Sequence, residues 1–308
     1  MPAPTRPATG TDLPDFARWL VHTQYTSVPS ETTRGMLVSM ATPVLDHLAT
    51  QDGIPPPRAP VVTLALIAAS AVLLLVGPSL GLSPGYGTGP NRICAEQRYE
   101  QRWGAVPAEL VANRPLTAAQ LATLPPAVPG CRLSPTPGKI PALSVLTSFF
   151  IHAGWLHLLG NMLFLFVFGP GVEERFGRFR FLLGYLAVGA LATYGYAAAQ
   201  AHSPEAVRAL VGASGAISGV LGAYLRLYPR ARVTALVPLL FFLPLRFPAW
   251  LVLGLWFALQ WWSVHTGGTE VAYLVHVIGF ATGYLATWAV TLARPDTLAP
   301  SPRTGADE

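Results

Sequence analysis

The sequence is poor in charged residues. Only 11% of its 308 residues are Asp, Glu, Lys or Arg, whereas 52% are hydrophobic. A soluble domain carries roughly 25% charged residues, so this chain lacks the charge that covers a water-facing surface of its size. The apolar residues also fall in long runs. The composition therefore excludes an ordinary soluble protein and predicts a polytopic membrane protein.

Cysteine and clustered basic residues are scarce as well. The chain has two cysteines, Cys94 and Cys131, and no group of Cys and His residues has the spacing of a zinc site. Basic stripes interleaved with aromatic residues, which are typical of nucleic-acid-binding proteins, are absent. The first apolar run begins near residue 61, too late for a secretory signal peptide. We therefore expect no metal, no nucleic-acid partner and no cleaved leader.

Six apolar segments have about the length that a helix needs to cross a bilayer core of ~30 Å, which is ~20 residues. They run at about 61–82, 155–171, 180–200, 209–228, 248–265 and 271–292. The segment 233–247 is also apolar, but Pro238 and Pro244 interrupt it, and we interpret it as a connector that lies along the membrane. These spans predict an all-α fold with six transmembrane helices.

The spans divide the chain into three parts. Residues 1–60 are expected to form an N-terminal cytoplasmic region with two short amphipathic helices, at about 13–24 and 31–50. Residues 61–292 form the six-helix membrane domain, which includes a long outer loop at 83–154. Residues 293–308 form a disordered C-terminal tail. The apolar end of the loop, 142–154, is predicted to dip into the membrane without crossing it.

Arginine placement predicts the orientation. The connection after the second span carries Arg175, Arg178 and Arg180, and the one after the fourth carries Arg226, Arg230 and Arg232. By the positive-inside rule these connections are cytoplasmic. Both termini are then cytoplasmic, and the loop 83–154 faces outside, in the plasma or inner membrane of a bacterium. An oxidising exterior makes Cys94 and Cys131 candidates for a disulfide, the alternative being two free thiols.

Four polar residues stand inside otherwise apolar spans, where polar groups are costly and mark functional sites. His157 and Asn161 open the second span four residues apart, Ser214 lies in the stretch Gly212-Ala213-Ser214-Gly215, and His276 opens the sixth span. Asn161, Ser214 and His276 each lie about five residues into a span, or ~7–8 Å deep at 1.5 Å per residue. Taken alone, each also fits helix packing; the joint pattern indicates a site.

The chemistry of these groups fits peptide hydrolysis. Ser214 is the candidate nucleophile and His276 the base that takes its proton. His157 and Asn161 are candidates to donate hydrogen bonds to an oxyanion. Glu173, Glu174, Glu205 and Glu270 all lie at predicted span ends, where none is positioned to complete a triad, so we expect a Ser–His dyad. The glycines Gly215, Gly219, Gly222, Gly279 and Gly283 are expected to bring the fourth and sixth spans into close contact.

At these residues the chain resembles a rhomboid intramembrane serine protease. Four stretches carry the resemblance, which covers about 145–292: residues 152–161, 169–177, 212–222 and 276–283. The resemblance implies Ser214 as nucleophile, His276 as base, and His157 and Asn161 as oxyanion donors. We also expect His152, Gly212, Gly215 and Gly279 to support the site.

The resemblance further implies a six-helix bundle with a membrane-associated loop between helices one and two, and structural roles for Glu173 and Arg175. It implies no metal and no cofactor. The partners it implies are the lipid bilayer and transmembrane protein substrates, single-span proteins that are cut in or near the membrane segment.

Two positions depart from the family pattern. Many members carry an aromatic residue one turn after the nucleophile, where it packs on the base, and here that position is Ser218. Ile278 stands where a glycine is common. The alternative function is a non-catalytic rhomboid-like scaffold that binds membrane helices without cutting them. A transporter or channel is disfavoured, because no charged residue lies clearly in mid-span.

Overall fold

The computed structural model describes residues 59–80, 82–237, 243–266 and 272–293. The chain divides into two units, Met1–Ala59 and Pro60–Glu308, and every element described below belongs to the second. The two amphipathic helices that we predicted before residue 60 and the predicted tail beyond Ala293 lie outside the described residues.

Six long helices occupy the predicted spans. They are α3 (Val61–Val76), α8 (Trp155–Phe176), α9 (Arg178–Ala199), α10 (Ser214–Leu227), α11 (Ala249–His265) and α12 (Tyr273–Ala293). Among the described residues, α8, α9 and α12 are long and apolar enough to cross a membrane, and α3 is a shorter apolar helix. Large apolar side chains such as Leu156, Phe179 and Trp262 are more than half exposed on these helices, as a lipid-facing surface requires.

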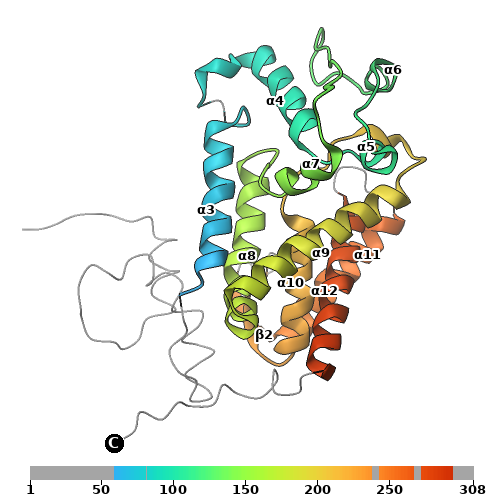
Figure 1. Ribbon diagram of the computed structural model, residues 1–308. Helices are drawn as coiled ribbons and strands as arrows, with labels where there is room; N and C mark the ends of the chain where they lie inside the picture. The colour runs from blue at the N-terminus through green and yellow to red at the C-terminus, as the bar shows by residue number, and fades with distance from the viewer. Residues whose placement is uncertain (1–58, 81, 238–242, 267–271, 294–308) are drawn as a thin grey trace, which may run out of the picture. The chain divides into compact units, whose positions relative to one another are not determined.

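Helix α10 lies at the centre of this bundle (Figure 1) and contacts α8, α9, α11 and α12. A continuous run of its residues, from Gly215 to Tyr224, is buried. The predicted span at 209–228 is therefore longer than the helix, which begins only at Ser214. The helix is shorter because the backbone of Gly212 has φ +112°, a left-handed conformation that cannot continue a helix.

Helices α10 and α12 form the most extensive helix–helix contact. A Cβ atom added to Gly279 or Gly283 of α12 would collide with the carbonyl oxygen of Gly215 or Gly219, respectively, on α10. A Cβ on Gly222 would collide with the Phe280 carbonyl. The two helices meet backbone to backbone, as small-residue patterns allow.

Glu173 fixes the start of α3 against α8. Its carboxylate accepts hydrogen bonds from the backbone N–H of Val62 (3.0 Å) and Thr63 (2.8 Å), and from the Thr63 hydroxyl (2.8 Å). The first N–H groups of a helix have no partner within the helix, and a carboxylate there also complements the helix dipole. The side chain of Glu173 is buried, so these bonds satisfy a charge that would otherwise be costly.

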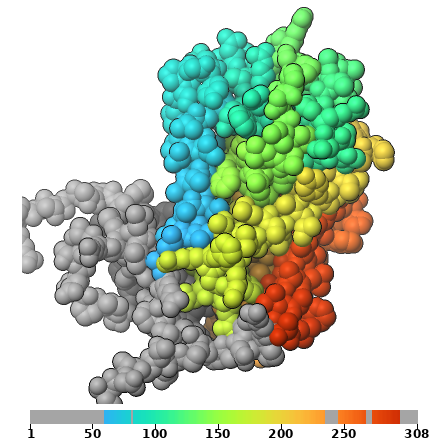
Figure 2. All heavy atoms as spheres, in the orientation of Figure 1, coloured from blue at the N-terminus to red at the C-terminus, as the bar shows by residue number. Residues whose placement is uncertain are grey.

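The connecting segment, residues 82–140, folds into short elements and covers one end of the helices (Figure 2). Its elements are η1 (Pro84–Tyr86), α4 (Gly89–Trp103), α5 (Pro107–Ala112) and α6 (Ala118–Leu121), and α7 (Pro141–Ser148) follows. A disulfide joins Cys94 of α4 to Cys131. About half of the loop predicted at 83–154 is thus helical.

The prediction of an all-α fold is wrong at one place. The segment that we interpreted as a connector contains a two-stranded antiparallel hairpin, β1 (Arg232–Val237) and β2 (Leu243–Pro248), with Arg232 opposite Pro248. Prolines interrupt a helix, but they are tolerated in edge strands, and both strands of a two-stranded ribbon are edges. The remaining elements in the described ranges are helical, apart from an isolated bridge between Ala105 and Leu210.

Candidate active site

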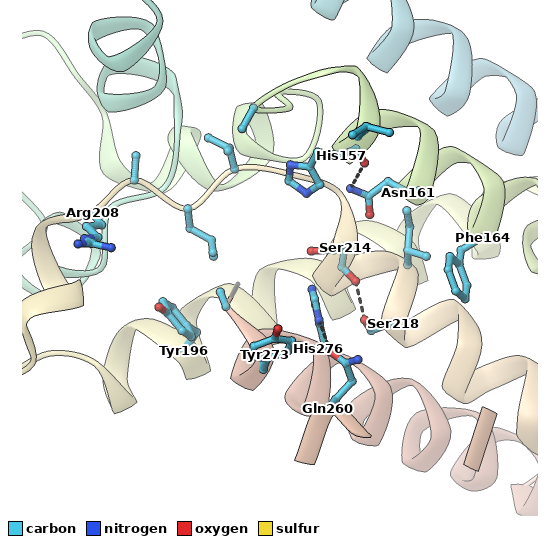
Figure 3. A pocket seen from close by; sticks show the side chains of 18 of the residues that line it. His157, Asn161, Phe164, Tyr196, Arg208, Ser214, Ser218, Gln260, Tyr273 and His276 are labelled. Carbon is cyan, nitrogen blue, oxygen red and sulfur yellow. Dashed lines mark hydrogen bonds between the residues drawn. The ribbon is translucent and has the colours of Figure 1, made fainter. Parts of the chain in front are cut away.

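The four candidate catalytic residues line one cavity of about 690 Å³. His157 and Asn161 project from α8, Ser214 from the start of α10, and His276 from the first turn of α12. In Figure 3 Ser214 lies between His157 and Asn161 on one side and His276 on the other. The structure therefore brings residues from three separate helices to one place.

Ser214 is the first residue of α10 and is half-buried. The first hydrogen bond of the helix runs from the Ile217 N–H to the Ala213 carbonyl, 2.9 Å. Backbone N–H groups of Ser214 and the next residues thus have no acceptor within the helix. The sequence predicted that Ser214 lies about five residues into a membrane span, but in the structure it has no helical turn before it. The residue instead stands at a helix N-terminus, where unpaired donors and partial positive charge favour an anion.

Gly212 brings the chain against the two candidate oxyanion donors. Its N–H donates to the Ser148 carbonyl at 2.9 Å. A Cβ atom on Gly212 would lie 2.8 Å from Cε1 of His157 and 3.6 Å from Nδ2 of Asn161. Only glycine combines this approach with a positive φ. The backbone that leads into Ser214 therefore passes directly beside both side chains.

Asn161 is buried and its amide is partly engaged. Nδ2 donates one hydrogen bond to the His157 carbonyl, at 3.1 Å. An amide nitrogen carries two hydrogens, so one remains for a ligand in the cavity. His157 and Asn161 sit four residues apart on one face of α8, as the sequence predicted.

His276 is held between aromatic rings and one amide. Its ring centroid is 6.0 Å from that of Trp256 and 6.4 Å from that of Tyr273. Its Nδ1 lies 2.8 Å from Oε1 of Gln260. Within the described residues no hydrogen bond joins His276 to Ser214, although both line the cavity. Catalytic hydrogen bonds are often long before substrate binds.

His152 does not line the cavity. Its side chain is 1% exposed and its ring meets that of His157 edge-on, with centroids 5.2 Å apart. Nδ1 lies 3.3 Å from the Phe150 carbonyl, whereas Nε2 is buried without a hydrogen-bond partner in the described part of the chain. Its contact with the site runs through the ring of His157.

The comparison with protein families matches a rhomboid domain to residues 142–293. The chain belongs to the rhomboid family. Its rhomboid domain contains all four candidate catalytic residues, and the connecting segment lies before it. Three helices in the described part of this rhomboid-family chain are long and apolar enough to cross a bilayer, and the chain is an integral membrane protein.

Two curated relatives resemble parts of the chain. "Putative rhomboid protease YdcA" of Bacillus subtilis (strain 168) is 39% identical over 82 residues, which are 26% of this chain and 39% of that protein. "Rhomboid-like protein 11, chloroplastic" of Arabidopsis thaliana is 48% identical over 44 residues, 14% of this chain and 16% of that protein. The matched regions thus span well under half of either relative.

Gln260 was missed by our reading of the sequence. It is a polar residue in the apolar helix α11, and the cost of polar groups in a membrane was the signal that could have found it. Charged side chains farther along the cavity wall were also missed: Glu100 of α4, Glu205 of η2 (Pro204–Val207) and Arg208. Glu100 shows that the connecting segment contributes to the wall of this cavity.

Ser218, one turn after Ser214 on α10, also lines the cavity. Its hydroxyl donates to the carbonyl of Ser214 at 2.6 Å, so it is engaged within α10. In the described ranges no group of three or more His, Cys, Asp or Glu residues is placed to hold a metal ion.

Proposed function

We propose that this rhomboid is an intramembrane serine endopeptidase that uses Ser214 and His276. The observation that carries the proposal is the shared cavity, in which a serine at a helix N-terminus stands between a histidine and a pair of polar donors. The chain also belongs to a family in which one curated relative is named a protease.

In the first step Ser214 Oγ attacks the carbonyl carbon of the scissile peptide bond. His276 accepts the hydroxyl proton at Nε2, and the carbonyl oxygen becomes an oxyanion. Asn161, His157 and the backbone N–H of Ser214 are the donors available to that oxyanion. The tetrahedral intermediate then breaks the C–N bond, and His276 returns its proton to the leaving amine. An ester of Ser214 remains.

In the second step water attacks the ester. His276 takes a proton from the water, the tetrahedral intermediate collapses, and the proton returns to Ser214 as the carboxylic acid leaves. The cavity has room for this water, because its volume of about 690 Å³ far exceeds the ~30 Å³ that one water occupies in the liquid. Polar side chains along the wall give the water partners.

The substrates of this activity are single-span membrane proteins cut in or near the membrane segment. A helix hides its carbonyls in hydrogen bonds, so a substrate segment with helix-weakening residues opens most easily before attack. We place the protein in a bacterial plasma or inner membrane, with six spans and cytoplasmic termini. The site then opens toward the outer face, on the side of the connecting segment.

The alternative function is a scaffold that binds membrane helices without cleaving them. Such a scaffold needs neither a nucleophile nor a base. Ser214 and His276 are both present and line the same cavity, and this arrangement favours the protease.

Cleavage of a single-span reporter protein in liposomes tests the proposal. Wild type is expected to cut the reporter, whereas Ser214→Ala and His276→Ala are expected to be inactive with unchanged thermal unfolding. Ser218→Ala is the matched control, because Ser218 lines the same cavity one turn farther along α10. A fluorophosphonate probe should label wild type and not Ser214→Ala. Equal labelling and cleavage by Ser214→Ala would refute the assignment.

A further inference from the structure

Helix α11 presents one amide side chain to the base of the candidate dyad. Gln260 lines the cavity and its Oε1 lies 2.8 Å from Nδ1 of His276, sixteen residues along the chain and on another helix. Figure 3 shows the two side chains meeting below Ser214. This contact between side chains of different helices is not fixed by local chain geometry.

We propose that Gln260 is a positioning residue for His276: it accepts a hydrogen bond from Nδ1–H and so presents Nε2 to Ser214. The inference rests on the proposed function and adds to it a third member, a neutral amide where other serine hydrolases use a carboxylate. Gln260 acts through His276 and touches no reacting atom.

The direction of the hydrogen bond decides whether His276 can act as a base. With Oε1 toward the ring, Nδ1 carries the hydrogen and Nε2 has a free lone pair. With the amide reversed, the NH₂ group would donate to Nδ1, and the hydrogen of the neutral ring would move to Nε2. That form cannot accept a proton from Ser214 at Nε2. Only an accepting amide is compatible with the dyad.

No other described side chain takes over this role. Trp256 and Tyr273 lie beside the ring of His276 without a hydrogen bond to it, and the Ser218 hydroxyl is engaged with the Ser214 carbonyl. Among the described residues, the charged groups that line the cavity, Glu100, Glu205 and Arg208, form no hydrogen bond or ion pair with His276. In the described part of the chain Gln260 is therefore the one hydrogen-bond partner of the base.

A neutral acceptor suits this place in the protein. A carboxylate within the apolar bundle carries a large desolvation cost, whereas an amide oxygen does not. When His276 takes the proton of Ser214 it becomes an imidazolium, and its Nδ1–H bond to Oε1 becomes charge-assisted and stronger. This hydrogen bond therefore stabilises mainly the charged transition state. Removing it should lower kcat more than it changes KM.

The kinetic test compares substitutions of similar shape. Gln260→Met removes the acceptor and keeps the length of the side chain. We expect kcat to fall roughly 10- to 100-fold, the range of one hydrogen bond to a charged group, with KM within about twofold of wild type. Gln260→Glu keeps the acceptor and is expected to recover much of this loss. Ser263→Ala, on the same helix but outside the cavity, is the control and should keep wild-type kcat.

The pH profile separates positioning from a structural role. A carboxylate at 260 favours the protonated imidazole, so the acid limb of the kcat profile should move to higher pH in Gln260→Glu. A side chain that only fills space would leave that limb in place. Wild-type kcat in Gln260→Met, or an unmoved limb in an active Gln260→Glu, would overturn the inference.

A spectroscopic test does not depend on cleavage. In protein labelled with ¹⁵N-histidine, the signal of His276, assigned with His276→Ala, should report the Nδ1–H tautomer in wild type. Gln260→Met should shift this signal toward the Nε2–H tautomer. An Nε2–H tautomer in wild type would overturn the inference even if the protein is a protease. An inactive wild type with the Nδ1–H tautomer would leave the hydrogen bond standing and refute the proposed function.

Discussion

Gly279 of α12 stands against the carbonyl oxygen of Gly215 on α10, with no room between them for a Cβ atom. Gly215 directly follows the candidate nucleophile, and Gly279 lies three residues after the candidate base. The contact therefore sets the separation of the two helices at the level of the site. Gly283 and Gly219 repeat it one turn farther along.

Gly279→Ala should impair both the fold and the activity. The added methyl group meets backbone, which cannot swing aside as a side chain can, so the helices must separate. Overpacking of this kind costs about 1–3 kcal/mol, and a displacement of ~1 Å between catalytic groups costs roughly 100-fold in rate. Thermal unfolding and reporter cleavage measure the two effects. Gly254→Ala on α11, where a Cβ meets nothing within 4 Å, is the control and should match wild type or be slightly more stable.

Asn161→Ala should slow turnover without abolishing it. If the free amide hydrogen of Asn161 contacts the oxyanion, its removal should lower kcat about 100-fold or more, with little change in KM. His157 and the Ser214 N–H would remain as donors, which accounts for residual activity. Single-turnover cleavage at saturating reporter concentration measures the rate constant of the variant. A rate constant equal to that of wild type would exclude the oxyanion role.

Hydropathy was sufficient to locate the six long helices, because lipid-facing and buried positions are both apolar over a whole helix. Polar residues within those runs, His157, Ser214 and His276, then pointed to the cavity. The start of α10 could not be read in this way. It depends on the positive φ of Gly212, which is set by the close passage of the chain past His157.

Other parts of the site depend on contacts that a single sequence does not reveal. Gln260 lies sixteen residues before His276, and no helical or strand periodicity connects the two. The hairpin at 232–248 was missed because its prolines were interpreted only as helix breakers. Glu100 reaches the cavity wall because the connecting segment folds back over the bundle, and its length gave no indication of that.

Lys139→Met should destabilise the connecting segment strongly. Nζ of Lys139 lies 2.6 Å from Oε2 of Glu109, and the two side chains are 3% and 2% exposed. Burial lowers the pKa of Lys139, while the neighbouring Glu109 acts to raise it. Loss of one partner leaves a buried, unpaired carboxylate, at a cost of about 3–5 kcal/mol. The double variant Lys139→Met/Glu109→Leu should recover much of this stability in thermal unfolding. A double variant no better than the single one would contradict this account.

The Cys94–Cys131 disulfide is expected to stabilise the part of the connecting segment that pairs with the cavity wall. The bond joins residues 37 positions apart. Closing a loop of this length stabilises the folded state by about 4 kcal/mol in the chain-entropy model. The end of α4 leads to Ala105, which exchanges backbone hydrogen bonds of 3.0 and 2.7 Å with Leu210, a cavity-lining residue. Cys94→Ser/Cys131→Ser should lower the unfolding midpoint and the cleavage rate together. Mass spectrometry of unreduced wild type should find the bonded peptides, and free thiols there would contradict the pairing.

Glu100 should make stability depend on pH in a defined direction. Burial, and secondarily the charge of Glu96, raises its pKa from 4.5 to about 7. Well below pH 4.5 the carboxyl is neutral in folded and unfolded chains, so it has no effect on stability. As pH rises from about 4.5 to 7 the unfolded chain releases the proton first, and the fold loses stability; above 7 the loss is constant.

Glu100→Gln removes that loss of stability. The difference between the unfolding midpoint of Glu100→Gln and that of wild type should therefore increase from about pH 4.5 to 7 and then stay constant. Glu96→Gln should give a smaller rise, since it removes only the lesser cause. Parallel curves for wild type and Glu100→Gln would show that the Glu100 carboxyl is solvated in the folded chain and would contradict its burial.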